Sequence, residues 1–442
     1  MGAEGFALAS LVALAVFIFW VGLVKIAFFP LSVLFELRSC IRRRDRSAWD
    51  LSPLVSIIVP CFNEARVLPA CVHSVLRSEY EFFELIIVDD GSTDNTKEVM
   101  LELGKLDSRI ITIHQRNAGK GAALNTGTEY ASGEFLMYVD ADGVFRPDTI
   151  AEMLRAFRHA KVGAVCGDDR PVNVDRTLTT LLALISHVGT GYVRRALAVV
   201  QCLPVVSGNI GMFRRSVLQE TGVLLTDSLG EDLELTWRVH RAGFQVAFAP
   251  RAIVYAESPS TLRGLWRQRV RWARGLIQAV VIHRGMIGNP RYGVFGVFLL
   301  FNTLSMLVVP LAQIVVLAGL PFVVFASPDF LPTSVVGWLS FLSVTVAGVL
   351  VVYALVLSRA WGDFRHAWTF PLWPIYAMFM GFTLAHALYL ELTGARRQWN
   401  KLERTGAISV KGLEAVKGAE AVTGVEAVKG ADPIVVKRNR SA

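Results

Sequence analysis

The chain has 442 residues, enough for one sizeable globular domain and further elements. Hydrophobic residues make up 53% of it and charged residues only 19%, which excludes an ordinary soluble protein. The net charge of +8 comes without a basic stripe of interleaved aromatic residues. We therefore expect no nucleic-acid partner and ascribe the charge to membrane topology and to anionic lipid headgroups.

The first segment is an apolar run from Phe6 to Phe35 that only Lys25 interrupts. It exceeds the roughly 20 residues that a helix needs to cross a bilayer. A signal peptide is the alternative, but the run is too long, lacks a preceding positive charge and has no clear cleavage site. Residues 1–37 are thus expected to be a retained transmembrane anchor. By the positive-inside rule, the basic residues that follow place the next domain in the cytoplasm: Arg38, Arg42, Arg43, Arg44 and Arg46.

Residues 51–285 have globular composition and alternate short apolar runs with helical stretches. The expected strands are Val55–Pro60, Leu85–Val88, Ile110–Ile113, Phe135–Val139 and Gly163–Cys166. The expected helices lie near Glu64–Arg77, Asn95–Leu103, Lys120–Tyr130 and Asp148–His159. This alternation is typical of an α/β domain with a doubly wound, mainly parallel sheet, which binds its ligand beyond the carboxyl ends of the strands. The five cysteines show no paired spacing, which suits a reducing compartment.

Two of these strands end in paired carboxylates, Asp89-Asp90 in one case and Asp140-Ala-Asp142 in the other. Either pair alone is commonly a turn or a helix cap. Together, at the carboxyl edge of one sheet, they predict a site for a hard divalent cation. Such a cation neutralises a diphosphate leaving group. The histidines, in contrast, have no zinc-site spacing.

Residues 55 to about 285 resemble glycosyltransferase family 2. The elements that carry the resemblance, in order, are Val59-Pro-Cys-Phe-Asn-Glu64, Val88-Asp-Asp-Gly-Ser-Thr-Asp94, Asn117-Ala-Gly-Lys-Gly-Ala-Ala-Leu-Asn125, Asp140-Ala-Asp142, Gly230-Glu-Asp232 and Gln268-Arg-Val-Arg-Trp272. The last is the QxxRW signature of processive members such as cellulose, hyaluronan, chitin-oligosaccharide and poly-N-acetylglucosamine synthases. The resemblance implies a GT-A nucleotide-sugar-binding domain with flanking transmembrane helices.

The resemblance also implies roles on the donor side. Asn63, Glu64 and Asp90 would hold the uridine, and Asp140 would contact the nucleotide. Lys120 would approach the nucleotide or its diphosphate; the alternative is a solvated lysine at a helix start. Asp142 would bind the metal, Mg²⁺ or Mn²⁺.

On the acceptor side, Asp232 would be the base that deprotonates the attacking hydroxyl. Glu231 would assist it, or would be structural or metal-orienting. Many relatives have Thr-Glu-Asp here, so Gly230 is a departure.

Five further residues complete the acceptor side. Arg271 would balance the diphosphate charge beside Gln268, and Trp272 would stack on the acceptor sugar. The alternative is an interfacial belt of indoles and snorkelling arginines. Ser207 and Gly208 resemble an acceptor-side loop, where a glycine lets the backbone approach a sugar.

Three apolar runs follow and form the expected transmembrane region 292–392: Tyr292–Phe325, Val335–Leu357 and Trp368–Leu390. Three spans would leave the tail outside, whereas its basic residues favour the inside, so the sequence leaves the number of spans open. Residues 408–442 repeat a hexad with glycine at its third position, and we expect a disordered tail without a catalytic role.

These observations predict an inverting, processive glycosyltransferase of the plasma membrane, with its catalytic domain in the cytoplasm. Its partners would be a UDP-sugar donor, a growing glycan acceptor, the lipid bilayer and a small membrane or export protein. The stretch from Leu262 to Gly275 most resembles poly-β-1,6-N-acetylglucosamine synthases, which implies UDP-N-acetylglucosamine as donor. The alternatives are a hyaluronan, chitin-oligosaccharide or other β-glycan synthase, a lipid glycosyltransferase that adds one sugar, and an inactive membrane scaffold.

Overall fold

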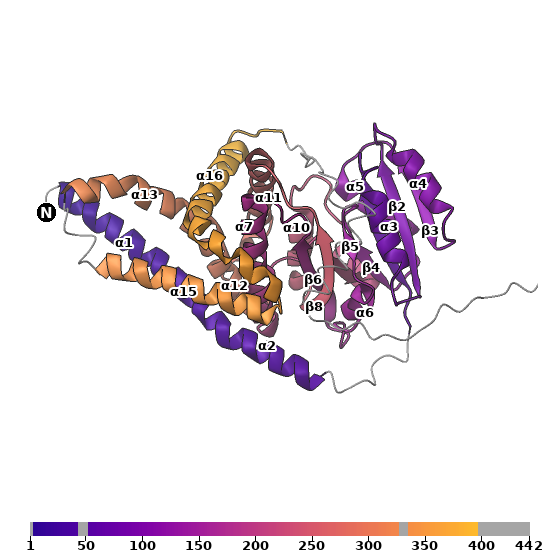
Figure 1. The fold of residues 1–442 in the computed structure, drawn as a ribbon, viewed down its shortest axis with the longest axis horizontal. Helices are drawn as coiled ribbons and strands as arrows, with labels where there is room; N and C mark the ends of the chain where they lie inside the picture. Colours follow the sequence, from indigo (N-terminus) through magenta and orange to yellow (C-terminus); the bar gives the residue numbers. More distant parts are fainter. Residues whose placement is uncertain (1–2, 43–51, 327–334, 397–442) are drawn as a thin grey trace, which may run out of the picture.

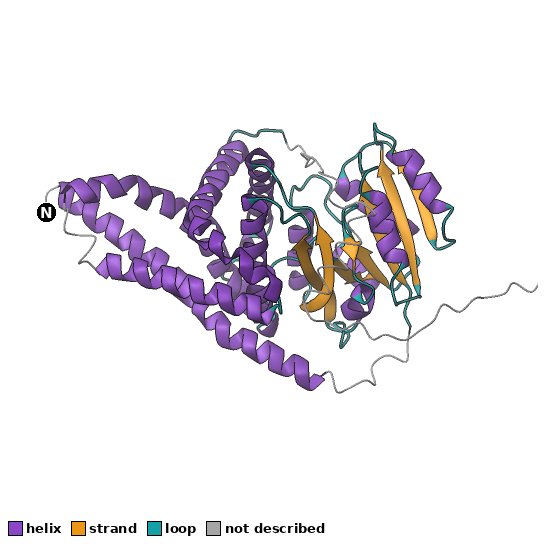
Figure 2. Cartoon of the chain, in the orientation of Figure 1, coloured by secondary structure: helices purple, strands orange, loops and turns teal. Residues whose placement is uncertain are grey.

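The computed structural model describes residues 3–42, 52–326 and 335–396. An α/β domain lies at one end of the molecule and a group of long helices at the other (Figure 1). Figure 2 shows that all strands lie in the α/β domain, while the other end is helical. The predicted tail, residues 408–442, lies outside the described part of the chain.

The α/β domain is built on one eight-stranded sheet with the order β3-β2-β1-β4-β7-β6-β8-β5. Its strands are β1 Val55–Cys61, β2 Phe83–Asp90, β3 Ile110–Gln115, β4 Phe135–Tyr138, β5 Val144–Phe145, β6 Val162–Pro171, β7 Gly211–Arg214 and β8 Gln245–Ala256. Strands β1 to β4 pair in parallel, as does β6 with β8, whereas β7 runs antiparallel to both its neighbours and β5 antiparallel to β8. The α/β prediction is confirmed. The sheet is mixed because β5 and β7, which the sequence did not reveal, pair antiparallel with their neighbours; β8, also unpredicted, pairs in parallel with β6.

Helices cover both faces of this sheet, as the alternation along its central strands requires. Ile57 and Val59 face a core shared with α3 Leu68–Leu76, α4 Thr96–Gly104 and α6 Thr149–Leu154. Ile58 faces the opposite core, shared with α5 Lys120–Tyr130, α8 Arg194–Val199 and α10 Glu231–Arg241. A short helix, α9 Arg215–Thr221, follows β7. The central strands are buried on both sides, which is why they are continuous apolar runs.

The helical end gathers segments from the N-terminal, middle and C-terminal parts of the chain. They are α1 Ala3–Val24, α2 Phe28–Arg42, α7 Thr177–Ser186, α11 Leu262–Ile282, α12 Gly293–Thr303, α13 Val309–Ala326, α15 Val335–Leu357 and α16 Trp373–Leu392, with π-helical turns at His187–Val193 and Leu304–Val308 and 3-10 turns at Lys25–Ala27, Arg284–Met286, Pro290–Tyr292 and Trp361–Leu372. Helices α13 and α15 pack on α1, and α16 packs on α11 and α13.

Three helical segments of the described residues are long and apolar enough to cross a membrane: Ala9–Ile41, Pro290–Gly319 and Trp361–Leu392. A shorter apolar stretch, Thr345–Leu357, lies in α15. The predicted run Trp368–Leu390 starts inside a 3-10 segment, and its α-helix begins only at Trp373. The predicted domain boundaries and the number of spans stay predictions.

Candidate active site

The residues that follow β1 and β2 are held together at the carboxyl edge of the sheet. Asn63 adopts a left-handed backbone with φ of 57°, and its side-chain oxygen accepts the backbone N–H groups of Thr93 and Asp94 at 2.7 and 3.2 Å. The backbone N–H of Glu64 donates to Thr96 Oγ1 at 2.8 Å, and the Glu64 side chain is buried. The loop after β1 is thereby fixed to the loop after β2.

Asp90 organises the next loop. Its carboxylate accepts three hydrogen bonds, from Gln115 Nε2 at 2.7 Å, from the Ala118 N–H at 2.9 Å and from the Gly119 N–H at 2.8 Å. A carboxylate offers about four acceptor positions, so most of them serve the protein itself. Gly119 has φ of +93°, a conformation open to glycine, and Lys120 follows as the first residue of α5. By holding Ala118 and Gly119, Asp90 fixes the position of Lys120 at the start of α5.

Lys120 lies between carboxylates from two other elements. Its Nζ forms an ion pair with Asp140 Oδ1 and lies 3.9 Å from Glu231 Oε1. The Lys120 side chain is only 12% exposed, which excludes the alternative of a solvated lysine. Burial alone would lower the Lys120 pKa, but the charges of Asp140 and Glu231 outweigh it and raise that pKa, so the ammonium stays protonated. Burial raises the pKa of Glu231 although the charges of Lys120 and Arg271 oppose this.

Asp232 occupies the first turn of α10, next to Glu231. Its Oδ2 accepts the backbone N–H of Gly208 at 3.1 Å, and its Oδ1 accepts that of Leu233 at 2.8 Å. A Cβ at Gly208 would lie 3.2 Å from Lys120 Nζ and 3.5 Å from Asp232 Oδ2. Gly208, in the loop before β7, therefore lies directly against the charged groups, and the missing side chain keeps its backbone next to them. The N–H of Ser207, the residue before it, donates to Cys166 Sγ at 3.4 Å.

Asp142 is the predicted metal ligand and is 2% exposed. Its Oδ2 accepts the backbone N–H of Glu257, just after β8, at 3.1 Å. Within the described residues no three His, Cys, Asp or Glu side chains form a metal-binding group. The donor set nevertheless fits Mg²⁺ or Mn²⁺, because such ions are commonly held by one or two carboxylates together with substrate phosphates and water.

The QxxRW residues lie on α11. Arg271 is close enough to Glu231 for its charge to lower the pKa of that carboxyl, so this side of α11 faces the site. Trp272 is 47% exposed, and the guanidinium of Arg269 lies 4.2 Å from the centre of its indole. Gln268 Oε1 is buried and accepts no hydrogen bond from the described residues. Burial also lowers the pKa of Arg269.

Helix α11 packs against α16. Trp266 donates a hydrogen bond from Nε1 to His386 on α16 at 3.2 Å and packs edge-on against Phe379. Arg274 binds Glu391 at 2.5 Å. An interfacial belt therefore does not account for Trp266.

Helix α11 holds Leu229 and Gly230, which directly precede Glu231 and Asp232, and no sequence motif predicts this contact. A Cβ at Gly230 would lie 3.0 Å from the Gly275 Cα, and one at Gly275 would lie 2.7 Å from the Gly230 nitrogen. Gln278 accepts the Leu229 N–H at 3.0 Å and donates to Glu391, also at 3.0 Å. The close crossing explains why glycine stands at position 230, where many relatives have threonine: the Cβ of a threonine there would meet the backbone of α11. Figure 1 shows α11 between α10 and α16.

Comparisons with known proteins show which family model, curated relatives and solved structure this chain is similar to. Residues 56–222 match the family model described as Glycosyl transferase family 2. The chain is 32% identical over 241 residues to poly-beta-1,6-N-acetyl-D-glucosamine synthase of Staphylococcus aureus (strain COL), covering 54% of this chain and 58% of that protein. The synthase of the same name from Staphylococcus epidermidis is 34% identical over 222 residues, covering 50% and 54%. The chain thus spans somewhat more than half the length of these curated relatives.

A solved structure shares the fold. The mannosyltransferase PcManGT from Pyrobaculum calidifontis, in complex with GDP-Man and Mn²⁺, superposes with a TM-score of 0.56 at 22% identity, covering 86% of this chain and all of that one. The likeness confirms the predicted GT-A fold.

Proposed function

We propose that this chain, which contains a glycosyltransferase family 2 domain, is a membrane-bound inverting glycosyltransferase that polymerises a β-linked glycan from a UDP-sugar. The observation that carries the proposal is the run of contacts from Asp140 through Lys120 to Glu231 and Asp232, with the QxxRW helix beside it. The names of the relatives favour N-acetylglucosamine as the sugar and a β-1,6 linkage.

On this proposal the donor lies over the carboxyl edge of the sheet. Asn63, Glu64 and Asp90 would shape the nucleotide side. Asn63 also holds the loop after β2, and Asp90 holds the loop from Gln115 to Gly119. Asp142, with the diphosphate oxygens, would hold Mg²⁺ or Mn²⁺, which would neutralise the leaving diphosphate. Lys120 stays protonated, so its charge is available to the same phosphates.

The acceptor hydroxyl would attack the anomeric carbon from the opposite side, with Asp232 as base. Asp232 suits this role because the Gly208 N–H and the first turn of α10 hold its carboxylate in place. Attack opposite the leaving diphosphate inverts the configuration at that carbon. Glu231, buried beside Lys120, would keep the lysine oriented. Trp272 is 47% exposed, and the acceptor sugar would stack on the indole face that Arg269 does not cover.

The membrane part supports repeated addition over single addition. Helix α11 is tied to α16 through Arg274 and Glu391, so the acceptor side adjoins a candidate membrane span. A polymer leaving the site would meet those helices at once. We further propose a multi-pass arrangement in the plasma membrane with the α/β domain in the cytoplasm, since Arg38 and Arg42 lie at the end of the first candidate span that leads into this domain. A small membrane or export protein would complete the path.

Sizing the products of membranes incubated with radiolabelled UDP-sugars tests the proposal. A ladder or a high polymer from UDP-N-acetylglucosamine is the expected result. A single labelled lipid would show instead a lipid glycosyltransferase, and a polymer from another UDP-sugar would identify a different β-glycan synthase. No labelled product from any UDP-sugar would overturn the proposal.

A further inference from the structure

Asn125 is the last residue of the motif that begins at Asn117, and it lies on α5 together with Lys120. Its side chain binds the main chain of one residue far along the sequence. Asn125 Nδ2 donates to the Leu224 carbonyl at 2.9 Å, and Asn125 Oδ1 accepts the Leu224 N–H at 3.1 Å. An asparagine amide can form such a pair because it carries a donor and an acceptor side by side. Leu224 is thereby tied to the helix that carries Lys120.

The connecting segment, residues 222–230, joins α9 to α10 and is held near both ends by other side chains. Near its start, the Val223 carbonyl accepts a hydrogen bond from Arg238 of α10 at 2.7 Å. Near its end, the Leu229 N–H donates to Gln278 of α11 at 3.0 Å. Neither of these partners lies on α5. The pair of hydrogen bonds described above therefore ties the middle of the connecting segment to that helix.

The middle of the connecting segment also lies against the first turn of α5. A Cβ at Gly121 would lie 3.3 Å from the Leu225 carbonyl oxygen and 3.5 Å from the Thr226 Cα. Gly121 follows Lys120 directly, so the main chain of the segment passes next to the turn that carries the lysine. A shift of the segment against α5 would change the spacing between Lys120 and the residues to which the segment leads.

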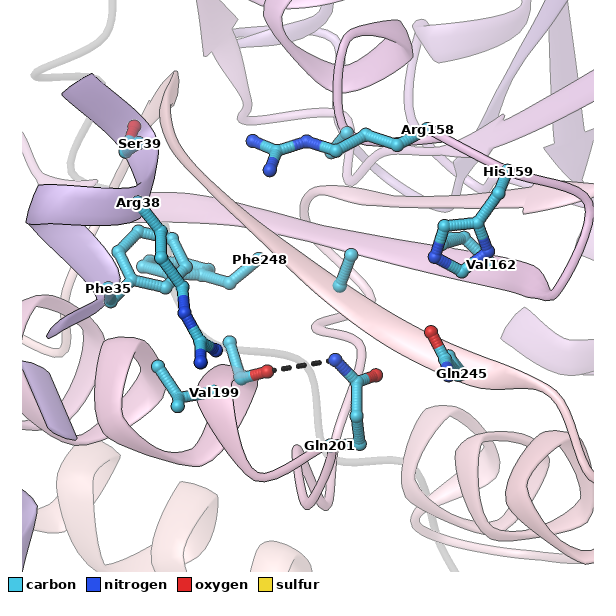
Figure 3. Close-up of a pocket in the computed structure, with 13 residues that line it drawn as sticks. Phe35, Arg38, Ser39, Arg158, His159, Val162, Val199, Gln201, Gln245 and Phe248 are labelled. Atoms are coloured by element: carbon cyan, nitrogen blue, oxygen red, sulfur yellow. Dashed lines mark hydrogen bonds between the residues drawn. The ribbon is translucent and has the colours of Figure 1, made fainter. Parts of the chain in front are cut away.

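The buried side chain of Leu224 lies beside the predicted base. Leu224, Glu231 and Asp232 line one cavity of only about 10 Å³, close to the least room that a single water molecule needs. A larger cavity, of about 330 Å³, lies elsewhere, between α2 and the amino ends of β6 and β8 (Figure 3). Because the space beside Asp232 is nearly filled, a displaced Leu224 would push against the two carboxylate residues.

We infer that Asn125 is a positioning residue for Asp232, a role that rests on the proposed function. Asn125 sets the connecting segment against α5, and Leu224 passes that position on to Glu231 and Asp232 at the start of α10. Lys120 on the donor side and Asp232 on the acceptor side thereby keep one spacing. Asn125 acts through Leu224 and not through contact with a substrate.

Asn125→Leu tests this role because it keeps roughly the size of the side chain and removes both hydrogen bonds. We expect kcat for incorporation from UDP-N-acetylglucosamine to fall roughly tenfold or more, since a misplacement of about 1 Å can cost about 10²-fold in rate. The affinity for UDP should stay near that of the wild type, because other loops hold the nucleotide side. The matched control is Glu129→Leu, one turn further along α5 at an exposed side chain, and it should leave both values unchanged.

Asn125→Asp is a second variant, chosen because it has the same size and can still accept the Leu224 N–H. Its carboxylate would face the Leu224 carbonyl in place of an N–H donor, so kcat should fall here too while the UDP affinity holds. Hydrogen–deuterium exchange of the full chain in detergent gives a structural readout. Exchange in residues 222–232 should be faster in both Asn125 variants than in the wild type and in Glu129→Leu.

The exchange measurement needs no sugar transfer, so it separates this inference from the proposed function. A wild type that forms no labelled product would refute the proposed function, whereas faster exchange in the variants would still support the hold of Asn125 on the segment. A wild-type kcat in Asn125→Leu would overturn the inference. So would unchanged exchange in residues 222–232, or a loss of UDP affinity as large as the loss in kcat, which would indicate a general structural role.

Discussion

Gly275→Ala should lower the rate of sugar transfer, because the added methyl group would push against the main chain of Leu229 and Gly230. The new Cβ would lie 2.7 Å from the Gly230 nitrogen and 2.8 Å from its Cα. Ordinary contacts begin at 3.4 Å, so the two backbones must separate by about 0.7 Å. No side chain can move aside, because the atoms that the methyl group meets belong to the main chain of Leu229 and Gly230.

This displacement acts on Asp232, only two residues beyond Gly230. A misplacement of about 1 Å in a catalytic group can cost about 10²-fold in rate, so we expect transfer to fall roughly 10- to 100-fold. The assay is the initial rate of incorporation from labelled UDP-N-acetylglucosamine in isolated membranes, together with the affinity for UDP. UDP affinity should change little, because the nucleotide side is built on the loops after β1 and β2.

Gly285→Ala is the matched control. Gly285 lies just beyond α11, and a Cβ there meets nothing within 4 Å, so transfer should stay near the wild-type rate. If Gly275→Ala, present at normal level, transferred sugar within twofold of the wild type, the crossing of α11 and α10 would not position the base.

Three further predictions concern the metal, the acceptor and the topology. Asp142→Asn should abolish turnover, and excess EDTA should silence the wild type until Mg²⁺ or Mn²⁺ is restored; full activity in EDTA would refute the metal assignment. Trp272→Ala should slow chain extension more than donor hydrolysis by water, because it removes an exposed stacking face; equal losses would argue against acceptor stacking. Cys40, exposed at the end of α2, should escape an impermeant thiol reagent in intact cells, and labelling before lysis would reverse the orientation.

The central strands could be predicted because each is buried on both faces. Val55–Cys61 and Phe83–Asp90 are continuous apolar runs with acidic or polar ends. Strand β7 was not predicted because it has only four residues, starts with glycine and ends with arginine, so its sequence shows neither an apolar run nor an alternation of apolar and polar residues. The helix predicted from Glu64 begins only at Leu68, since Glu64 belongs to the loop held by Thr96 and Pro69 favours a helix start there.

From the sequence, only those candidate site residues that lie in short motifs could be predicted. Asp140, Asp142 and Asp232 stand out because strand ends and a helix start carry carboxylates in sequence. The three hydrogen bonds to Asp90 are set by the loop from Gln115 to Gly119, which no local pattern reveals. The contact of Gly230 with Gly275 likewise depends on how two helices cross, which is a property of the tertiary structure.

Asp232→Asn tests the central claim most directly, measured as polymer formed from UDP-N-acetylglucosamine beside the affinity for UDP. Asparagine keeps the size and can still accept the Gly208 N–H, but it cannot take the proton of the acceptor hydroxyl. Polymer formation should fall by about 10²–10⁴-fold, the usual contribution of a positioned base, while UDP affinity stays near that of the wild type. Chain extension at a near wild-type rate would contradict the assignment of Asp232 as the base and would make Glu231 the next residue to test.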